Sequence, residues 1–306
     1  MTATTTMTEK LTGVFPVMVT PFGENGEVDE GSLDRLVDFL LERKCHGLTV
    51  LGVMGEAARL LESERDRVAD RVLNRVAGRV PVVVGAGGGG SRVAAEFARR
   101  AEALGAAALL VAPPFMPSPN LDAVFAYYAD VAAAVPNVPL FVQDYPPVAG
   151  VSMPVPFLER LAKEIATARA VKLEDPPTPP KIGRLRALFP EPARLRIFGG
   201  LGGVYCLQEL ERGGDGIMTG YAYPEHLLSI YAKFRAGDRA SAAAEYARRL
   251  PLIAYEGQIG IGIAIRKEIL KRRGAIACAA VRRPTAAIDD ATRAELALVL
   301  DRTIGA

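Results

Sequence analysis

One short stretch of the chain reads Ala168-Arg169-Ala170-Val171-Lys172-Leu173-Glu174-Asp175 and runs into Pro176-Pro177. An apolar run of this length that ends in charge and proline predicts a β-strand. A lysine in such a strand must either reach water at the strand end or face an interior cavity. Burial penalises a charged ammonium, and a neutral amine is a nucleophile toward carbonyl carbons. Lys172 is therefore a candidate for Schiff-base chemistry.

Seven further apolar runs are spaced along the chain, at residues 13–20, 47–52, 81–85, 107–112, 139–143, 195–199 and 216–220. Stretches with apolar residues at three- and four-residue intervals lie between them and predict helices, at residues 32–43, 63–76, 91–104, 122–134 and 156–165. Continuous apolar strands are typical of a parallel sheet buried on both faces, and eight of them can close a (β/α)8 barrel. A doubly wound open sheet is the alternative.

After the eighth run the pattern is helical, at residues 226–235, 239–253, 262–273 and 292–303. The sequence thus predicts an α/β fold, a (β/α)8 TIM barrel with a C-terminal helical extension. We expect an N-terminal tail over residues 1–12, the barrel over 13–225 and the helical region over 226–306. The charged run Arg266-Lys267-Glu268 is interpreted as the solvent-exposed face of a helix.

The composition of the chain limits the partners that can be expected for it. The 306 residues are 50% hydrophobic with a net charge of +2, so neither nucleic acid nor an anionic membrane is an expected partner. Three widely spaced cysteines and an N-terminus without an apolar segment predict a cytoplasmic protein. Two histidines lie far apart, and no metal-ligand spacing is present, so no metal is expected. The glycine-rich run at residues 85–91 lacks the acidic partner of a dinucleotide site, and no cofactor is predicted.

In a barrel of this kind the active site lies at the carboxyl ends of the strands. The ordered motifs at those ends resemble the dihydrodipicolinate synthase / N-acetylneuraminate lyase family of Schiff-base aldolases. The resemblance covers nearly the whole chain and depends on the order and spacing of five features, Val19-Thr20-Pro21-Phe22, Gly52-Val53-Met54-Gly55-Glu56, Pro146, Lys172 and Gly199-Gly200.

The resemblance implies that Lys172 forms an imine with pyruvate or another 2-oxo acid, which then stabilises the adjacent carbanion. It also implies that the loop Gly52, Val53, Met54, Gly55 and Glu56 binds the substrate carboxylate, for which backbone N–H groups suffice. Family members commonly assemble from dimers into tetramers, so we expect a homo-oligomer.

The chain departs from the family at the residues that move protons. Val53 and Met54 stand where the family has hydroxyl side chains, and Gln143 and Phe115 stand at its tyrosine positions. The synthases' substrate-binding arginine is replaced by Val148. The tyrosine relay of the lysine-precursor synthases cannot be assembled from these side chains, so that activity is rejected. A shifted alignment would instead make Tyr145 the acid.

Glu174 is the predicted replacement proton shuttle. Strand side chains alternate, so Glu174 shares a face with Lys172 and should enter the same cavity. A salt bridge that closes the barrel mouth is the alternative role for it. We expect Gln143 to orient the substrate without acting as an acid.

Further candidates follow the seventh and eighth strands. Gly199, Gly200, Thr219 and Tyr221 are predicted to line the substrate pocket, although Tyr221 could equally pack beneath the helical region. The sequence thus predicts a Schiff-base lyase, an aldolase or a dehydratase, acting on a 2-oxo acid with few hydroxyls. Two other hypotheses stay open: a barrel without catalysis that binds a small molecule or regulates, and a lysine-based enzyme whose substrate is not a 2-oxo acid.

Overall fold

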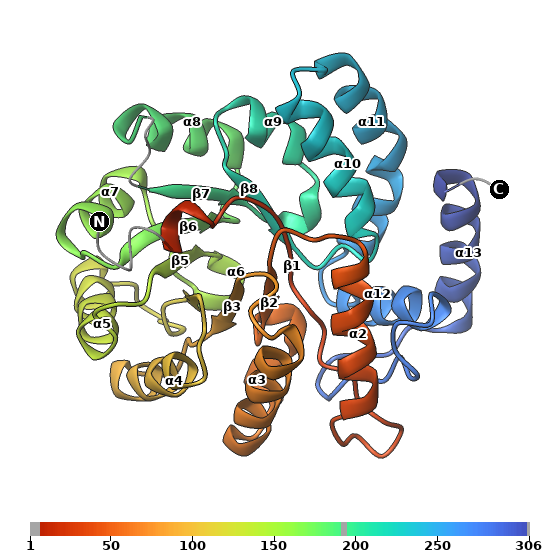
Figure 1. Ribbon diagram of the computed structural model, residues 1–306, viewed down its shortest axis with the longest axis horizontal. Helices are drawn as coiled ribbons and strands as arrows, with labels where there is room; N and C mark the ends of the chain where they lie inside the picture. The colour runs from red at the N-terminus through yellow and green to blue at the C-terminus, as the bar shows by residue number, and fades with distance from the viewer. Residues whose placement is uncertain (1–6, 191–194, 305–306) are drawn as a thin grey trace.

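A computed structural model describes residues 7–190 and 195–304 and confirms the predicted barrel. Within these residues eight parallel strands form one sheet in the order β1-β8-β7-β6-β5-β4-β3-β2, and a bridge between Val17 and Thr49 joins its two ends (Figure 1). The strands are β1 (Gly13–Pro16), β2 (Leu48–Val50), β3 (Val82–Gly85), β4 (Ala108–Val111), β5 (Leu140–Asp144), β6 (Ala168–Leu173), β7 (Arg196–Gly199) and β8 (Gly216–Thr219).

Helices surround the barrel. The longer ones before the sixth strand are α2 (Glu30–Glu42), α3 (Glu62–Val76), α4 (Ser91–Ala103), α5 (Leu121–Ala134) and α7 (Val155–Glu164). Each lies within two residues of its predicted range. Shorter segments follow three strand ends, and these are η1 (Val53–Gly55), η2 (Ala57–Arg59), α6 (Pro146–Ala149) and η3 (Leu201–Gly203).

Two barrel helices were not predicted, α8 (Thr178–Leu188) and α9 (Cys206–Glu211). The start of α8 reads Thr178-Pro179-Pro180, and prolines usually indicate that a helix is interrupted. They are tolerated here because the first turn of a helix needs no intrahelical N–H donor. The six residues of α9 are too few to show a helical period.

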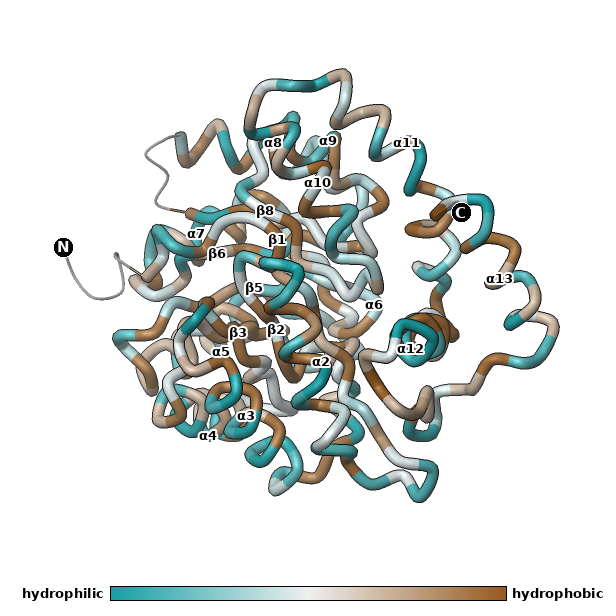
Figure 2. Tube along the Cα trace, turned by 45° about the vertical axis from the view of Figure 1, so that its right-hand side comes forward, coloured by the Kyte–Doolittle hydropathy of each residue, from teal (hydrophilic) through white to brown (hydrophobic). Residues whose placement is uncertain are grey.

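The barrel interior is filled by large apolar side chains that alternate with outward-facing ones along each strand. Phe15, Phe141 and Phe198 pack edge to face, with ring centroids 5.4 Å and 5.2 Å apart. Leu110, Ala170 and Met218 belong to the same interior cluster. The strand segments β2 and β3 are correspondingly hydrophobic in Figure 2. This packed floor closes the barrel below the carboxyl ends of the strands.

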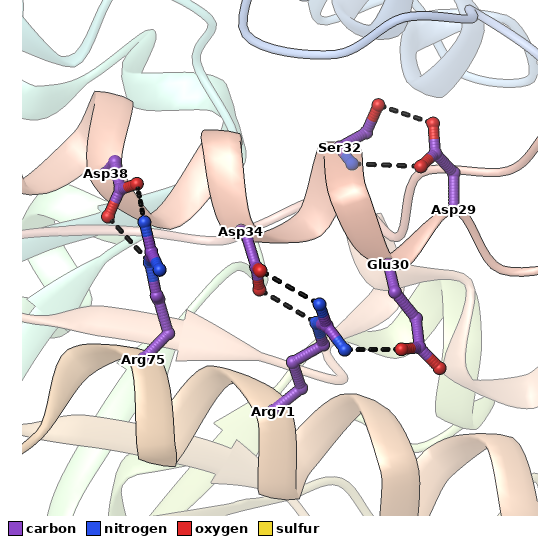
Figure 3. A network of polar contacts seen from close by, with 7 residues as sticks. All are labelled: Asp29, Glu30, Ser32, Asp34, Asp38, Arg71 and Arg75. Atoms are coloured by element: carbon purple, nitrogen blue, oxygen red, sulfur yellow. Dashed lines mark hydrogen bonds and ion pairs between the residues drawn. The ribbon is translucent and has the colours of Figure 1, made fainter.

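Charged side chains join α2 to α3 on the outside of the barrel (Figure 3). The Arg71 guanidinium donates to Asp34 with both Nε and Nη2, at 2.8 Å and 2.9 Å, and also contacts Glu30. Arg75 pairs with Asp38 one turn further along. These side chains are 25% to 45% exposed, so the pairs contribute little to the stability of the fold.

The last four helices are α10 (Pro224–Arg235), α11 (Arg239–Glu256), α12 (Gly262–Arg272) and α13 (Asp290–Ile304). Helix α10 packs against β1, whereas α12 and α13 lie to one side of the barrel (Figure 1). The predicted division between residues 225 and 226 stays a prediction. No helix among residues 7–190 and 195–304 is long and apolar enough to span a membrane.

Candidate active site

Lys172 lies inside the barrel, one layer above the aromatic floor. Ala170 belongs to the interior cluster, so the alternation along β6 places Lys172 and Glu174 on the same inward face. In the sheet register Lys172 is flanked by Gln143 of β5 and Phe198 of β7. The lysine side chain is 6% exposed. Of the two positions predicted for this lysine, the interior cavity is therefore the one it occupies.

Glu174 contacts both predicted partners. Its Oε2 atom lies 2.9 Å from Lys172 Nζ and accepts a hydrogen bond of 2.9 Å from Gln143 Nε2. The backbone N–H of Leu201 points at the other oxygen, 3.4 Å away. An amine, a carboxylate and a carboxamide thus meet at the carboxyl ends of two neighbouring strands, β5 and β6. The geometry suits a base beside an imine and equally describes a buried ion pair.

The glycines after β7 make room for this carboxylate. A Cβ atom at Gly200 would lie 2.4 Å from Glu174 Cγ, closer than side-chain atoms can approach. The backbone at this point therefore excludes any other residue unless Glu174 moves.

Gly199 packs in the same way against a second carboxyl group, Glu209 of α9. A Cβ atom at Gly199 would lie 1.8 Å from Glu209 Oε2, and the other oxygen accepts a 2.5 Å hydrogen bond from Thr178. Burial raises the pKa of Glu209 to about 8, so this side chain is neutral near pH 7. Sequence analysis missed Glu209 because a carboxylate in a short helix carries no signal of burial.

The loop after β2 presents backbone donors. Among the described residues, the N–H groups of Val53 and Met54 donate to no protein acceptor, since they begin the turn η1. Thr20 Oγ1 donates to the carbonyl of Gly55 over 2.7 Å and anchors the turn from β1's side. The predicted carboxylate-binding role of this loop stays a prediction that the free donors permit.

The side chain of Glu56 is held by the helical region. Its carboxylate accepts hydrogen bonds from Lys267 Nζ at 2.6 Å and from the backbone N–H of Arg282 at 3.0 Å. Glu56 also lines the pocket described below, and its predicted part in substrate binding stays a prediction. The prediction that Arg266 and Lys267 form an exposed helix face is wrong, because both are buried at 7% and 0% exposure. They are covered by the loop of residues 52–56, which is 211 positions away in the sequence.

Tyr145 follows β5 as the residue before α6 and is half-buried. Burial and then the negative charge of Glu174 raise its pKa, whereas the positive charge of Arg266 acts in the opposite direction. This coupling places Tyr145 near the polar cluster. Its part as an alternative acid stays a prediction.

The residues after β8 are arranged differently from the prediction. Tyr221 is 2% exposed, and its hydroxyl lies 2.9 Å from His226 Nδ1 of α10. Tyr223 stacks on the same imidazole. Tyr221 thus packs beneath the helical region and does not line the substrate pocket. Thr219 is buried at the end of β8, and its carbonyl accepts from Val17 of the first strand segment.

A pocket of about 640 Å³ opens beside Gln143. Gly52 and Val53 line its inner part, and Phe115 and Val148, 68% and 41% exposed, lie at its rim. Sequence analysis missed two further kinds of lining residue, the glycines of residues 87–89 and the guanidinium groups of Arg59 and Arg65.

Arg65 is the more buried of these two arginines. It donates to the carbonyl of Gly85 over 3.1 Å and lies over the ring of Phe97. Neither Arg59 nor Arg65 forms an ion pair with a carboxylate in the part of the chain that the structure describes. The same described residues hold no cluster of ligands that fits a metal ion.

Comparisons with known proteins agree with this architecture. Residues 10–303 match the dihydrodipicolinate synthetase family. The chain is 34% identical to the L-2-keto-3-deoxyarabonate dehydratase of Azospirillum brasilense, over 98% of this chain and 96% of that protein. It is 30% identical to the 4-hydroxy-tetrahydrodipicolinate synthase of Acidiphilium cryptum, over 78% and 81% of the two chains.

A solved structure is similar over its whole length. The dihydrodipicolinate synthase of Rhodopseudomonas palustris superposes with a TM-score of 0.90 at 36% identity and covers 99% of both chains. The chain therefore belongs to the dihydrodipicolinate synthetase family and is a lyase of the Schiff-base-forming, class I aldolase type.

Proposed function

We propose that this enzyme is a dehydratase that removes water from a 3-deoxy-2-oxo sugar acid through an imine on Lys172. The observation that carries the proposal is the 2.9 Å contact of Lys172 Nζ with Glu174, whose same oxygen is held by Gln143. The similarity to a dehydratase over nearly the full length of both chains supports dehydration as the reaction.

The first step joins the amine to the substrate. Lys172 transfers one proton to Glu174, and its Nζ attacks the C2 ketone carbon. A second Nζ proton passes to the ketone oxygen, Glu174 returns the first proton to the resulting hydroxyl, and water leaves as the protonated imine forms. A protonated imine withdraws electrons from C3 and makes its hydrogens acidic. Formation of the protonated imine restores a positive charge at Nζ, so Glu174 is again a carboxylate beside a cation before the next step.

The second step is the elimination. Glu174 as a carboxylate takes a proton from C3, and the electron pair forms an enamine. The enamine then expels the hydroxyl at C4, which accepts the proton from Glu174 and leaves as water. Hydrolysis of the resulting unsaturated imine frees Lys172 and the 2-oxo acid product. One carboxylate beside Nζ serves both proton transfers, because C3 is bonded directly to the imine carbon.

We propose that the free N–H groups of Val53 and Met54 bind the substrate carboxylate and that the distal carbons enter the pocket beside Gln143. The apolar side chains of Val53, Phe115 and Val148 suit a substrate with few hydroxyl groups. The same positions support rejection of the lysine-precursor synthase activity, since they offer no tyrosine relay. Thr219, Gly199 and Gly200 shape the cavity without touching the reacting atoms.

Aldol cleavage is the second candidate function, because it starts from the same protonated imine. It requires a base at the C4 hydroxyl rather than an acid, and Tyr145 near Glu174 and Arg266 is the side chain that favours it. The two reactions give different products from one substrate. Cleavage releases pyruvate and an aldehyde, whereas dehydration retains all carbon atoms.

The test is to incubate the protein with pyruvate and with five- and six-carbon 3-deoxy-2-oxo acids, reduce with borohydride and weigh the intact chain. We expect an adduct on Lys172, and NMR of an unreduced reaction should show a dehydrated acid and no pyruvate. Lys172→Ala serves as the control and should give no adduct. Release of pyruvate from these acids would show that the reaction is aldol cleavage and not dehydration. Folded protein without any adduct would favour a barrel that only binds or regulates.

We further propose a homo-oligomeric, cytoplasmic enzyme. The exposed ring of Phe115 beside Val148 forms an apolar rim that a second copy of the chain could cover. The three cysteines are unpaired thiols, which suits a reducing compartment. Mass photometry should give a dimer or tetramer, and a monomer at micromolar concentration would contradict the assembly.

A further inference from the structure

Helix α12 reaches the loop of residues 52–56 through a completely buried ion pair. Lys267 and Glu56 have side chains with no exposed surface, and their charged atoms lie 2.6 Å apart. Lys267 Nζ also donates to the carbonyl of Ala280 over 2.8 Å and lies 4.2 Å from the ring centre of Phe22. The second oxygen of Glu56 accepts from the backbone N–H of Arg282. Both carboxylate oxygens of Glu56 and the ammonium group of Lys267 thus have hydrogen-bond partners.

This ion pair is a weak source of stability. Burial lowers the pKa of Lys267 to about 8 although Glu56 opposes the shift, so the cost of desolvation exceeds the attraction. The other titratable groups that face Lys267 are Cys278 and Arg282, both from the segment after α12. Buried pairs of this kind can often be replaced by apolar residues without loss of stability. The effect of the pair on the backbone geometry of the loop is therefore more informative about function than its contribution to stability.

The imposed geometry is a left-handed backbone at Glu56, with φ of 53° and ψ of 32°. A non-glycine residue adopts this conformation only where its surroundings hold it. The same residue closes η1, since its N–H donates to the carbonyl of Val53. This hydrogen bond orients the planar peptide unit that joins the carbonyl of Val53 to the N–H of Met54, so Glu56 helps to set where that free N–H points.

A second contact from α12 supports the same turn. Arg266 is held by Glu256 of α11 at 2.7 Å, and its Nη1 lies 3.0 Å from Met54 Sδ. Two consecutive residues of α12 thus contact this turn, Arg266 at its middle residue Met54 and Lys267 at Glu56, which follows its last residue.

We propose that Lys267 is a positioning residue for substrate binding, which holds Glu56 so that the backbone donors of Val53 and Met54 bind the carboxylate of the 2-oxo acid. The inference rests on the proposed function, because it requires that this loop binds the substrate carboxylate. It predicts that binding weakens when Lys267 loses its charge, without direct contact between Lys267 and the substrate.

The experiment measures the pyruvate concentration that gives half-maximal borohydride trapping, at pH 7.0 and at pH 9.5. The proteins are the wild type, Lys267→Gln and the control Lys271→Gln, an exposed lysine on the same helix. The ratio of variant to wild type at one pH cancels every effect of pH that all three proteins share. At pH 7.0 we expect Lys267→Gln to need about ten times more pyruvate, equivalent to about 1.4 kcal/mol.

At pH 9.5 the wild type has itself lost the charge on Lys267, so the ratio should fall toward one. The maximal trapped yield should stay unchanged, and Lys271→Gln should give a ratio of one at both values. A ratio of one at pH 7.0 would overturn the proposal, whereas the same raised ratio at both values would support the positioning role and place the pKa of Lys267 above 9.5. If Lys267→Gln does not fold, Glu56→Gln with Lys267→Met replaces it, because removing both charges leaves none unpaired.

Failure of the proposed function is distinguishable from failure of this inference. Without an adduct in the wild type, the function fails first and the ratios have no meaning. With an adduct whose half-saturating concentration does not respond to Lys267, the imine chemistry stands and the positioning role is lost.

Discussion

Glu174 is the ionisable side chain that lies beside the amine of Lys172. It accepts from Lys172, Gln143 and the backbone of Leu201, so each oxygen has a defined direction. The family's tyrosine positions hold Gln143 and Phe115, which do not titrate. In the proposed dehydration, Glu174 beside Nζ is therefore the group that carries a proton to and from C3.

Substitution of Glu174→Gln should separate imine formation from elimination. The amide keeps the size of the side chain and its packing against Gly200 but cannot accept a proton from C3. We expect kcat to fall by roughly 10²- to 10⁴-fold while borohydride still traps pyruvate on Lys172. Turnover within about twofold of the wild type would show that another group, with Tyr145 the first candidate, moves the proton.

A methyl group at Gly200 should disturb the same carboxylate from the other side. Gly200→Ala places Cβ 2.4 Å from Glu174 Cγ, so either Glu174 or the backbone must shift. We expect a loss of stability of about 1–3 kcal/mol and a tenfold or larger fall in kcat. Gly90→Ala is the control, because nothing lies within 4 Å of its added Cβ and its backbone is extended. Equal activity of both variants would mean that Glu174 adapts freely.

At the level of elements, α10 is fixed to the end of β8 by a buried imidazole. His226 bonds to the hydroxyl of Tyr221 and stacks on Tyr223 at 5.0 Å. Burial, and next the positive charge of Arg249, lowers the pKa of His226 to about 4. The folded protein therefore keeps this side chain neutral in mildly acidic solution.

This imidazole should make the fold acid-sensitive. The pKa is about 4 in the folded chain and 6.5 ordinarily, so between these values the unfolded chain binds more protons and stability falls as the pH falls. Urea unfolding at pH 7 and pH 4 should show a loss of about 2–3 kcal/mol attributable to His226. His226→Gln should lose correspondingly less, with His46 common to both proteins. Identical pH slopes would contradict the assignment.

The C-terminal helices illustrate a limit of reading elements from a sequence. Their positions were predicted to within three residues, because apolar periodicity along a helix is a local property. The burial of Arg266 and Lys267 was not, because their partners Glu256 and Glu56 come from other segments. A charged run has the same appearance in a sequence whether it meets water or a buried carboxylate.

For the molecule as a whole, α12 connects the last quarter of the chain to the loop after β2. Because Lys267 and Arg282 both bond to Glu56, the barrel and the helical region should unfold together. Calorimetry should give a single transition whose calorimetric and van't Hoff enthalpies agree at constant protein concentration. An early transition of the C-terminal helices, with trapping on Lys172 retained, would show that the two regions are independent.

The sequence was sufficient to predict the barrel, the interior position of Lys172 and the face that Lys172 shares with Glu174. The number of strands and the alternation of side chains along a strand can both be recognised from neighbouring residues. The sequence could not reveal that Glu56 pairs with Lys267, that Tyr221 binds His226 or that Lys267 is buried. The orientation of Tyr221 depends on the packing of the helical region against the barrel, because His226 lies in α10. The contact of Glu56 with Lys267 joins segments that are far apart in the sequence and meet only through the same packing. A local sequence pattern carries no information about such a partner.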